Sequence, residues 1–169
     1  MSELLRGVYD AVGLDYLAWK YIHIISATLL FGTGLGTAFH MYSSHLSGDP
    51  RAIAVAARNT VIADWTFTTP AVVVQPLSGL MLAVAIGADV TGGWVLASLL
   101  LYVFVGCCWL PVVWLQMRAR RLAEHAVATG SPLPATYFRV MRVWFLLGWP
   151  AFFGVLIIFY MMLYKALPI

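Results

Sequence analysis

Few residues of this chain could do chemistry, and the most informative is His23, which stands inside a long apolar stretch. A neutral imidazole is a common axial ligand of haem iron, and an ionisable residue at membrane depth is costly and therefore indicates function. Gly34 follows on the same helical face and would leave room for a flat macrocycle. Gln75 lies near the middle of another apolar stretch, where it must bond either a carbonyl freed by proline or a ligand.

Three more residues extend the hypothesis of a haem site. Met161 lies at a depth that matches His23, so its thioether could complete a His/Met iron site, although methionine is also common core filler. Lys20 and Lys165 lie nearer the membrane surface, where they either meet haem propionates or extend to the lipid headgroups. The glycines around Gly34 leave a similar choice, because small residues four apart also favour close helix packing.

A second group of polar residues lies at the opposite membrane surface. His40 is ~25 Å beyond His23 along a helix, so one cofactor cannot use both. Near the level of His40 the sequence places a carboxylate, tryptophans and arginines: Asp64, Trp65, Trp114, Arg118, Arg142 and Trp144. An Asp64–His40 pair could orient a second metal-ligating imidazole or relay protons. The alternative is a network of salt bridges at the helix ends. His45 and His125 are expected to be solvated.

The composition places these residues in a membrane. Of 169 residues, 62% are apolar and 10% are charged, and the mean hydropathy is +0.88. Average soluble domains carry about 25% charged residues, so the composition excludes a soluble enzyme, a disordered chain and a nucleic-acid-binding protein. The adjacent cysteines Cys107 and Cys108 point ~100° apart on a helix and predict no disulfide.

We predict an all-α fold, a four-helix bundle that spans the membrane as a single domain over residues 1–169. About 20 helical residues cross the hydrocarbon core, and four stretches meet that length: 17–42, 61–86, 94–117 and 143–165. Each of the last three contains proline, which neighbouring helices can accommodate in a membrane. Tryptophans near the ends of the stretches, Trp144 among them, predict an aromatic belt.

Charge predicts the orientation of the bundle. The connection after the first stretch holds Arg51 and Arg58, and the connection after the third holds five further arginines. The positive-inside rule places both connections in the cytoplasm and both termini on the outer, periplasmic side of a bacterial inner membrane. Residues 4–12 are either a short interfacial helix or a frayed tail, and residues 49–59 are a candidate helical extension.

Several stretches resemble a group of bacterial four-helix membrane proteins. The first is Lys20-Tyr-Ile-His23-Ile-Ile, followed by Phe31 and the glycines, and the others are Asp64-Trp-Thr-Phe-Thr-Thr-Pro70, Gln75-Pro-Leu-Ser-Gly79 and Phe159-Tyr-Met-Met-Leu-Tyr-Lys165. The group includes the HemJ-type protoporphyrinogen oxidases, the CopD-like copper-resistance domains and the membrane domain of some urate-oxidising proteins. Within it, the chain is most similar to a family of predicted integral membrane proteins.

The resemblance implies a haem b in the bundle, with His23 as an axial ligand. The Pro-Arg pair that HemJ-type enzymes carry later in the first helix is replaced by Thr37-Ala-Phe-His40, and the second and third stretches contain no lysine. These departures argue against protoporphyrinogen oxidation and leave the reaction and the redox partner open.

Three functions are compatible with these features. The leading hypothesis is a haem b protein that transfers electrons. The first alternative is a scaffold without a cofactor, which assembles with itself or in a larger membrane complex. The second is a transporter or copper-handling domain, but the histidines and methionines do not converge at one depth.

Overall fold

The computed structural model describes residues 2–167, which form helices joined by short connections, without strands. The elements are α1 (Ser2–Val12), α2 (Tyr16–Ser47), α3 (Pro50–Ala63), the π-helical turn η1 (Asp64–Thr68), α4 (Thr69–Ala85), α5 (Gly93–Thr129) and α6 (Ala135–Tyr164). α3, η1 and α4 form one continuous helix over Pro50–Ala85.

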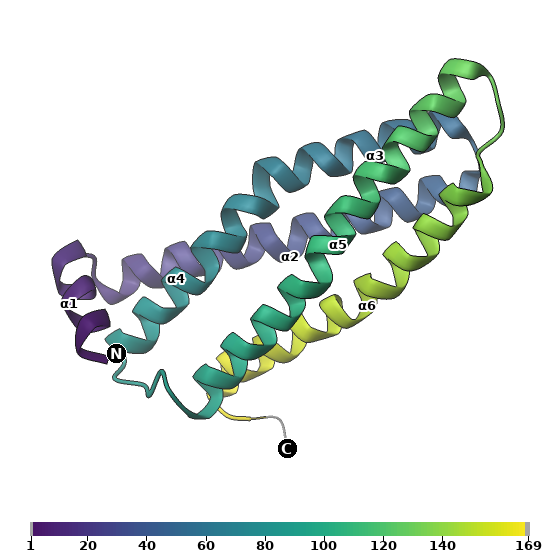
Figure 1. The fold of residues 1–169 in the computed structure, drawn as a ribbon. Coiled ribbons are helices and arrows are strands. Elements are labelled where there is room, and N and C mark those ends of the chain that lie inside the picture. The colour runs from purple at the N-terminus through teal and green to yellow at the C-terminus, as the bar shows by residue number, and fades with distance from the viewer. Residues whose placement is uncertain (1, 168–169) are drawn as a thin grey trace.

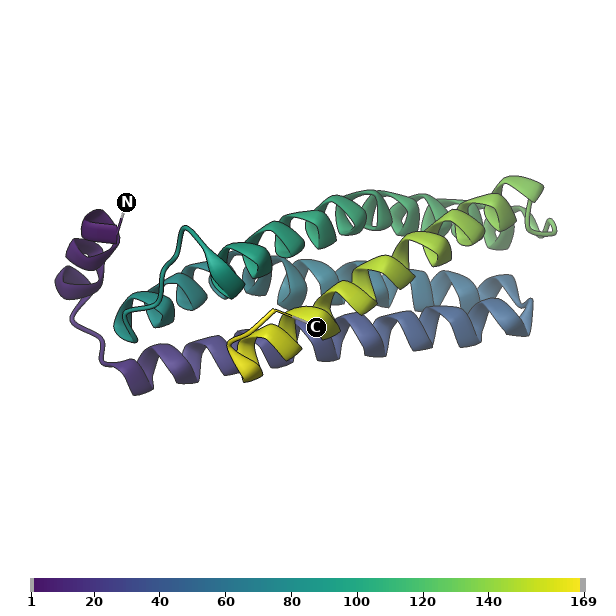
Figure 2. The same ribbon diagram turned by 90° about the horizontal axis from the view of Figure 1, so that it is seen from below.

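Four of these helices are long and apolar enough to cross a membrane: α2, the α3–η1–α4 helix, α5 and α6. They lie side by side in an elongated bundle (Figures 1 and 2). α1, the connection 86–92 and the end of α6 lie at one end, which we call the terminal end. The connections 48–49 and 130–134 lie at the other, which we call the arginine end. The predicted all-α, four-span fold is confirmed.

The helices extend beyond the predicted spans at the arginine end, where 49–59 is helical as anticipated. α2 ends at Gly48, whose φ of 68° lies in the left-handed region that glycine adopts readily. Asp49 then caps α3 by accepting a hydrogen bond from the Arg51 N–H at 2.9 Å. Similarly, Gly130 ends α5 with a φ of 63°, well past the predicted limit of 117. A helix does not have to end where the hydrocarbon ends, so hydropathy underestimates its length.

The best-packed part of the bundle lies toward the arginine end. There α3 packs closely on α5 and α2, while α5 packs along α6. Ala57, Ala119 and Ala123 are fully buried and allow the close approach. Toward the terminal end, α2 pairs with α4 and α5 pairs with α6. These two helix pairs diverge there (Figure 1). Side chains fill most of the space between them and leave a small cavity.

Pro76 lies inside α4 and has no N–H to donate to the carbonyl of Val72, four residues earlier. The Tyr102 hydroxyl of α5 donates to that carbonyl at 2.8 Å instead. Unsatisfied backbone groups cost several kcal/mol in lipid, so a neighbouring helix compensates here for the proline. The bond also joins the α2–α4 pair to the α5–α6 pair.

The segment before the first span is the helix α1, which settles the choice between a helix and a tail. Gly13, with a φ of 68°, separates it from α2, and α1 lies across the terminal end of the bundle (Figure 2). Leu5 packs against the cluster around Ala83 and Val95, whereas Leu4 and Val8 are exposed. This arrangement is typical of a helix that lies at a membrane surface.

Candidate functional site

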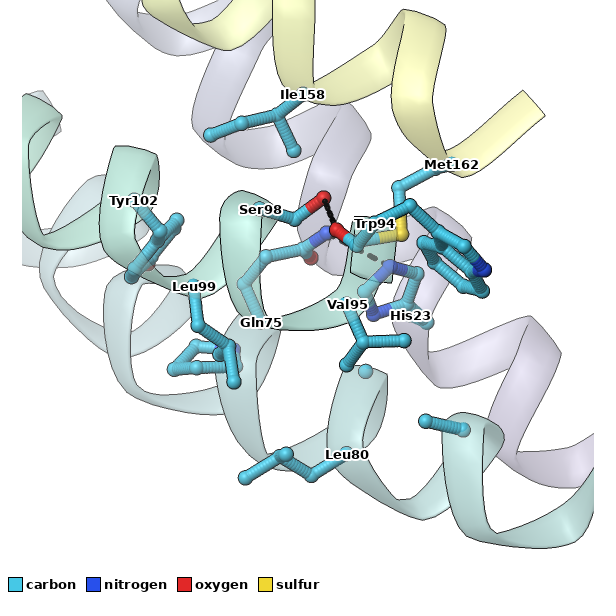
Figure 3. Close-up of a pocket in the computed structure, with 13 residues that line it drawn as sticks. His23, Gln75, Leu80, Trp94, Val95, Ser98, Leu99, Tyr102, Ile158 and Met162 are labelled. Carbon is cyan, nitrogen blue, oxygen red and sulfur yellow. Dashed lines mark hydrogen bonds between the residues drawn. The ribbon is translucent and has the colours of Figure 1, made fainter. Parts of the chain in front are cut away.

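His23 lies between α2 and α4 toward the terminal end, and both of its ring nitrogens have partners. Nδ1 lies 2.9 Å from the Ser78 hydroxyl, and Nε2 lies 3.1 Å from the amide nitrogen of Gln75. Both partners belong to α4, three residues apart on one face. Figure 3 shows His23 and Gln75 pointing toward each other among the residues that line a small cavity.

The Ser78 hydroxyl determines which ring nitrogen carries the proton. Its Oγ lies 2.7 Å from the carbonyl oxygen of Val74 and 3.1 Å from that of Gln75, and a carbonyl can only accept. The hydroxyl proton therefore goes to a carbonyl, and Oγ accepts a hydrogen bond from Nδ1–H of His23. In the neutral imidazole, Nε2 is left with a lone pair, which is the form of histidine that binds a metal.

Two further residues hold this arrangement in place. Ser26, buried one turn along α2, donates to the Gln75 side-chain oxygen, so the Gln75 NH₂ group faces His23. Gly79 packs directly against the imidazole, because a Cβ at this position would lie 3.0 Å from Cε1 of His23. Ser26, Ser78 and Gly79 were not among the site residues predicted from the sequence.

The cavity beside His23 lies between the two helix pairs. Apolar side chains of α4, α5 and α6 form most of its wall, including Leu80, Trp94, Leu99 and Met162 (Figure 3). Its volume is about 40 Å³. A water molecule takes about 30 Å³, so the cavity in this arrangement is much smaller than a haem.

The chemistry of the cavity fits haem better than its volume does. Nε2 of His23 supplies the lone pair that iron requires. Trp19 lies one helical turn before His23, outside the cavity, and its indole N–H is buried without a hydrogen-bond partner in the described chain. Such a donor would suit an acidic group such as a propionate. A macrocycle would therefore find an iron ligand in His23, but only after the two helix pairs had separated and Gln75 had left Nε2.

The other predicted haem contacts lie outside the cavity. Gly34 is exposed, and a Cβ there would meet nothing within 4 Å. Met161 is buried against Ser98, whose hydroxyl lies 3.8 Å from the sulfur, whereas its neighbour Met162 lines the cavity. Lys20 is exposed and lies over the Tyr16 ring, and Lys165 is exposed where α6 ends.

The predicted Asp64–His40 pair does not form. Asp64 is buried in η1, where it accepts hydrogen bonds from the Gln116 amide of α5 and from the Thr68 hydroxyl at 3.0 Å. The oxygen of Gln116 accepts from the indole N–H of Trp144 on α6 at 3.3 Å. Among the described residues, no hydrogen bond or ion pair joins Asp64 to His40, which is exposed. A π-helical turn adds a residue to the helix and often marks functional sites.

The interfacial salt-bridge network is also absent from residues 2–167, where the ion pair present joins Arg120 to Glu124 at 2.7 Å. Arg118 lies instead over the ring of Trp114, 5.3 Å from its centroid. Trp144 belongs to the buried core and not to an aromatic belt, because its N–H finds a partner in Gln116.

The two remaining histidines differ. His125 is exposed, as predicted. His45 is half-buried, and its Nδ1 lies 3.1 Å from the hydroxyl of the buried Tyr137, so the expectation of a solvated side chain is wrong. Within the described residues, no three His, Cys, Asp or Glu side chains form a group that could hold a metal ion.

The model of one known protein family matches nearly the whole chain. This family, described as "Predicted integral membrane protein (DUF2269)", matches residues 17–166, which cover the four spans and leave out α1. No curated protein and no solved structure matches the chain.

Proposed function

The chain belongs to the DUF2269 family of predicted integral membrane proteins, and from its His23 site we propose that it binds haem b and transfers electrons. One observation carries the proposal: the lone pair of His23 Nε2, which the Gln75 amide covers in this arrangement, lies beside an apolar cavity between four membrane helices. Axial ligation and an apolar shell are the means by which a protein adjusts haem iron. Haem, when bound, would supply the one-electron chemistry that the side chains lack.

Each residue of the site has a defined task in this proposal. Ser78 orients the imidazole by accepting from Nδ1–H, as the outer partner of a metal-ligating histidine usually does. Gly79 leaves space for the ring. In the cofactor-free protein, the Gln75 amide donates a hydrogen bond to Nε2 of His23. When haem binds, Gln75 would lose this bond and keep the one that it accepts from Ser26.

We propose Met162 as the second iron ligand. The thioether candidate moves from Met161 to Met162, because Met162 lines the cavity and Met161 packs on Ser98. Gly34, Lys20, Lys165 and His40 are not needed at this site.

We further propose the setting of the protein. Arginines gather at the arginine end, so the positive-inside rule places that end in the cytoplasm of a bacterial inner membrane, with both termini outside. The stretches around His23 and Gln75 that resemble HemJ-type and CopD-like proteins now form one site, which supports a relationship to those haem proteins.

A second candidate function rests on a different observation. Since Ser78 and Gln75 satisfy both nitrogens of His23, the network joins α2 to α4 without any cofactor. Interhelical hydrogen bonds of this kind stabilise membrane bundles by about 0.6 kcal/mol each on average. The protein would then be a scaffold or a subunit of a larger membrane complex.

A reduced-minus-oxidised visible spectrum separates the two candidates. The full-length protein is expressed with an adequate haem supply and purified in detergent. The haem proposal predicts a Soret band at about one haem per chain, with sharp bands in the reduced form. Protein without pigment, in a defined heteromeric complex by native mass spectrometry, would reject haem binding and favour the scaffold.

A further inference from the structure

A second cavity lies at the arginine end, between α2 and α6, far from the His23 site. Its volume is about 260 Å³, and it is lined by Tyr42, His45, Phe138, Met141, Arg142 and Phe145. His45 lies ~33 Å along α2 from His23, so the two sites are separate. A ligand of this cavity would bind whether or not the protein holds haem at His23.

The walls of this cavity are mainly aromatic, and contacts between the rings hold them in place. The rings of Tyr42 and Phe145 stack with centroids 4.8 Å apart. The His45 ring meets Phe138 edge to face, with centroids 6.0 Å apart. Tyr137, fully buried, holds His45 through Nδ1, which leaves Nε2 available to a ligand.

The cavity also carries a positive charge. Arg142 lines it and is exposed, and no described residue forms an ion pair with it. A planar guanidinium with free donors is suited to a phosphate group. The ligand that matches this wall is therefore an anion attached to an apolar body.

The surroundings favour a lipid as that anion. On the membrane side of the cavity, Leu35 lies two turns before Tyr42 on α2 and is 49% exposed, and Leu146 follows Arg142 by one turn on α6 and is 63% exposed. These side chains continue the faces of the cavity as an apolar surface. Basic pockets between membrane helices at an arginine-rich surface bind anionic headgroups.

We propose that this cavity binds the phosphate headgroup of an anionic phospholipid, with Arg142 and His45 on the phosphate and the acyl chains along α2 and α6. The site makes the protein sensitive to the lipid composition of its membrane.

The test compares lipids on the full-length protein purified in detergent. Phosphatidylglycerol, phosphatidylcholine with the same acyl chains, and inorganic phosphate are each added, and bound lipid is counted by native mass spectrometry while unfolding is followed by heating. We expect phosphatidylglycerol to bind and to raise the Tm, and the other two to have little effect. Equal effects of the two lipids, or of inorganic phosphate, would overturn the proposal.

Arg142→Gln supplies the matched variant. Loss of one charge-assisted hydrogen bond should weaken phosphatidylglycerol binding by about tenfold. The control is Arg139→Gln, one turn earlier on α6, because Arg139 is exposed, does not line the cavity and lies 3.4 Å from Thr136. Equal losses in both variants would indicate general charge attraction and would also overturn the proposal.

Discussion

The Nε2 atom of His23 lies 3.1 Å from the amide nitrogen of Gln75, and this contact joins α2 to α4 inside the bundle. The bond has a fixed polarity, since Ser78 accepts from Nδ1–H and Ser26 donates to the Gln75 oxygen. The lone pair of His23 Nε2, which lies at membrane depth, is therefore covered by the Gln75 side chain, and this side chain can move away. This relationship connects the cofactor-free arrangement to the proposed haem site.

Gln75→Leu should separate the two roles of this contact. It removes the donor to Nε2, so the cofactor-free protein should lose about 1 kcal/mol of unfolding free energy. Haem binding should persist, because Gln75 is not a ligand in our proposal. Thermal unfolding and the Soret band of the same preparation check both expectations. Loss of the band in Gln75→Leu would contradict the role given to Gln75.

Gly79→Ala should disturb the imidazole. The new Cβ would lie 3.0 Å from Cε1 of His23, so the ring must shift by a few tenths of an ångström, which disturbs its hydrogen bonds to Ser78 and Gln75. We expect a loss of about 1–3 kcal/mol. Gly106→Ala on α5 is the control, because a Cβ there meets nothing within 4 Å. If both variants were equally stable in thermal denaturation, the contact between Gly79 and His23 would have no energetic role.

Tyr102→Phe should leave the Val72 carbonyl without a donor. A buried carbonyl that loses its partner costs about 1–3 kcal/mol. Pro76→Ala restores the missing N–H within α4, so the cost of Tyr102→Phe should shrink in that background. A double-mutant cycle on unfolding free energies measures the coupling. Additive costs would show that the proline and the tyrosine are independent.

Gln116→Leu should be among the most destabilising changes at the arginine end. It leaves Asp64 without its amide donor and Trp144 without an acceptor, which we expect to cost about 2–4 kcal/mol. Replacing Asp64 and Gln116 together by leucine should cost less than Gln116→Leu alone, because both partners are then apolar. Unfolding in detergent, with far-UV circular dichroism as the signal, compares the variants. A double variant less stable than the single one would refute this explanation.

The sequence was sufficient for the fold because lipid imposes strong rules. Only helices satisfy their own backbone in hydrocarbon, so apolar length alone predicts the spans. The sequence also identified His23 and Gln75 as candidate site residues, since a polar residue in an apolar span must face the bundle. The partners Ser26 and Ser78 follow His23 and Gln75 by three residues, a spacing that places each pair on one helical face. That spacing is a signal from which both serines could have been predicted.

Other features required the packing of the bundle. Whether Asp64 meets His40 or Gln116 depends on helix rotation, and the π-helical turn η1 changes that rotation in a way that hydropathy does not encode. Likewise, Met161 and Met162 are the same residue type, and only the rotation of α6 about its axis decides which one lines the cavity. Gly34 was expected beside the cofactor on the face of His23, but no neighbouring helix covers it, since it is exposed and a Cβ there would meet nothing within 4 Å.

The most direct measurement of the central claim is the haem content of three matched proteins: wild type, His23→Ala and His125→Ala. His125 is exposed and distant in sequence from the site, so it controls for nonspecific binding by histidine. Each protein is purified from cells supplied with haem, and the Soret absorbance is divided by protein concentration. We predict about one haem per chain in wild type and His125→Ala, and an absent or shifted band in His23→Ala. An unchanged band in His23→Ala, or no band in wild type, would contradict haem binding at His23.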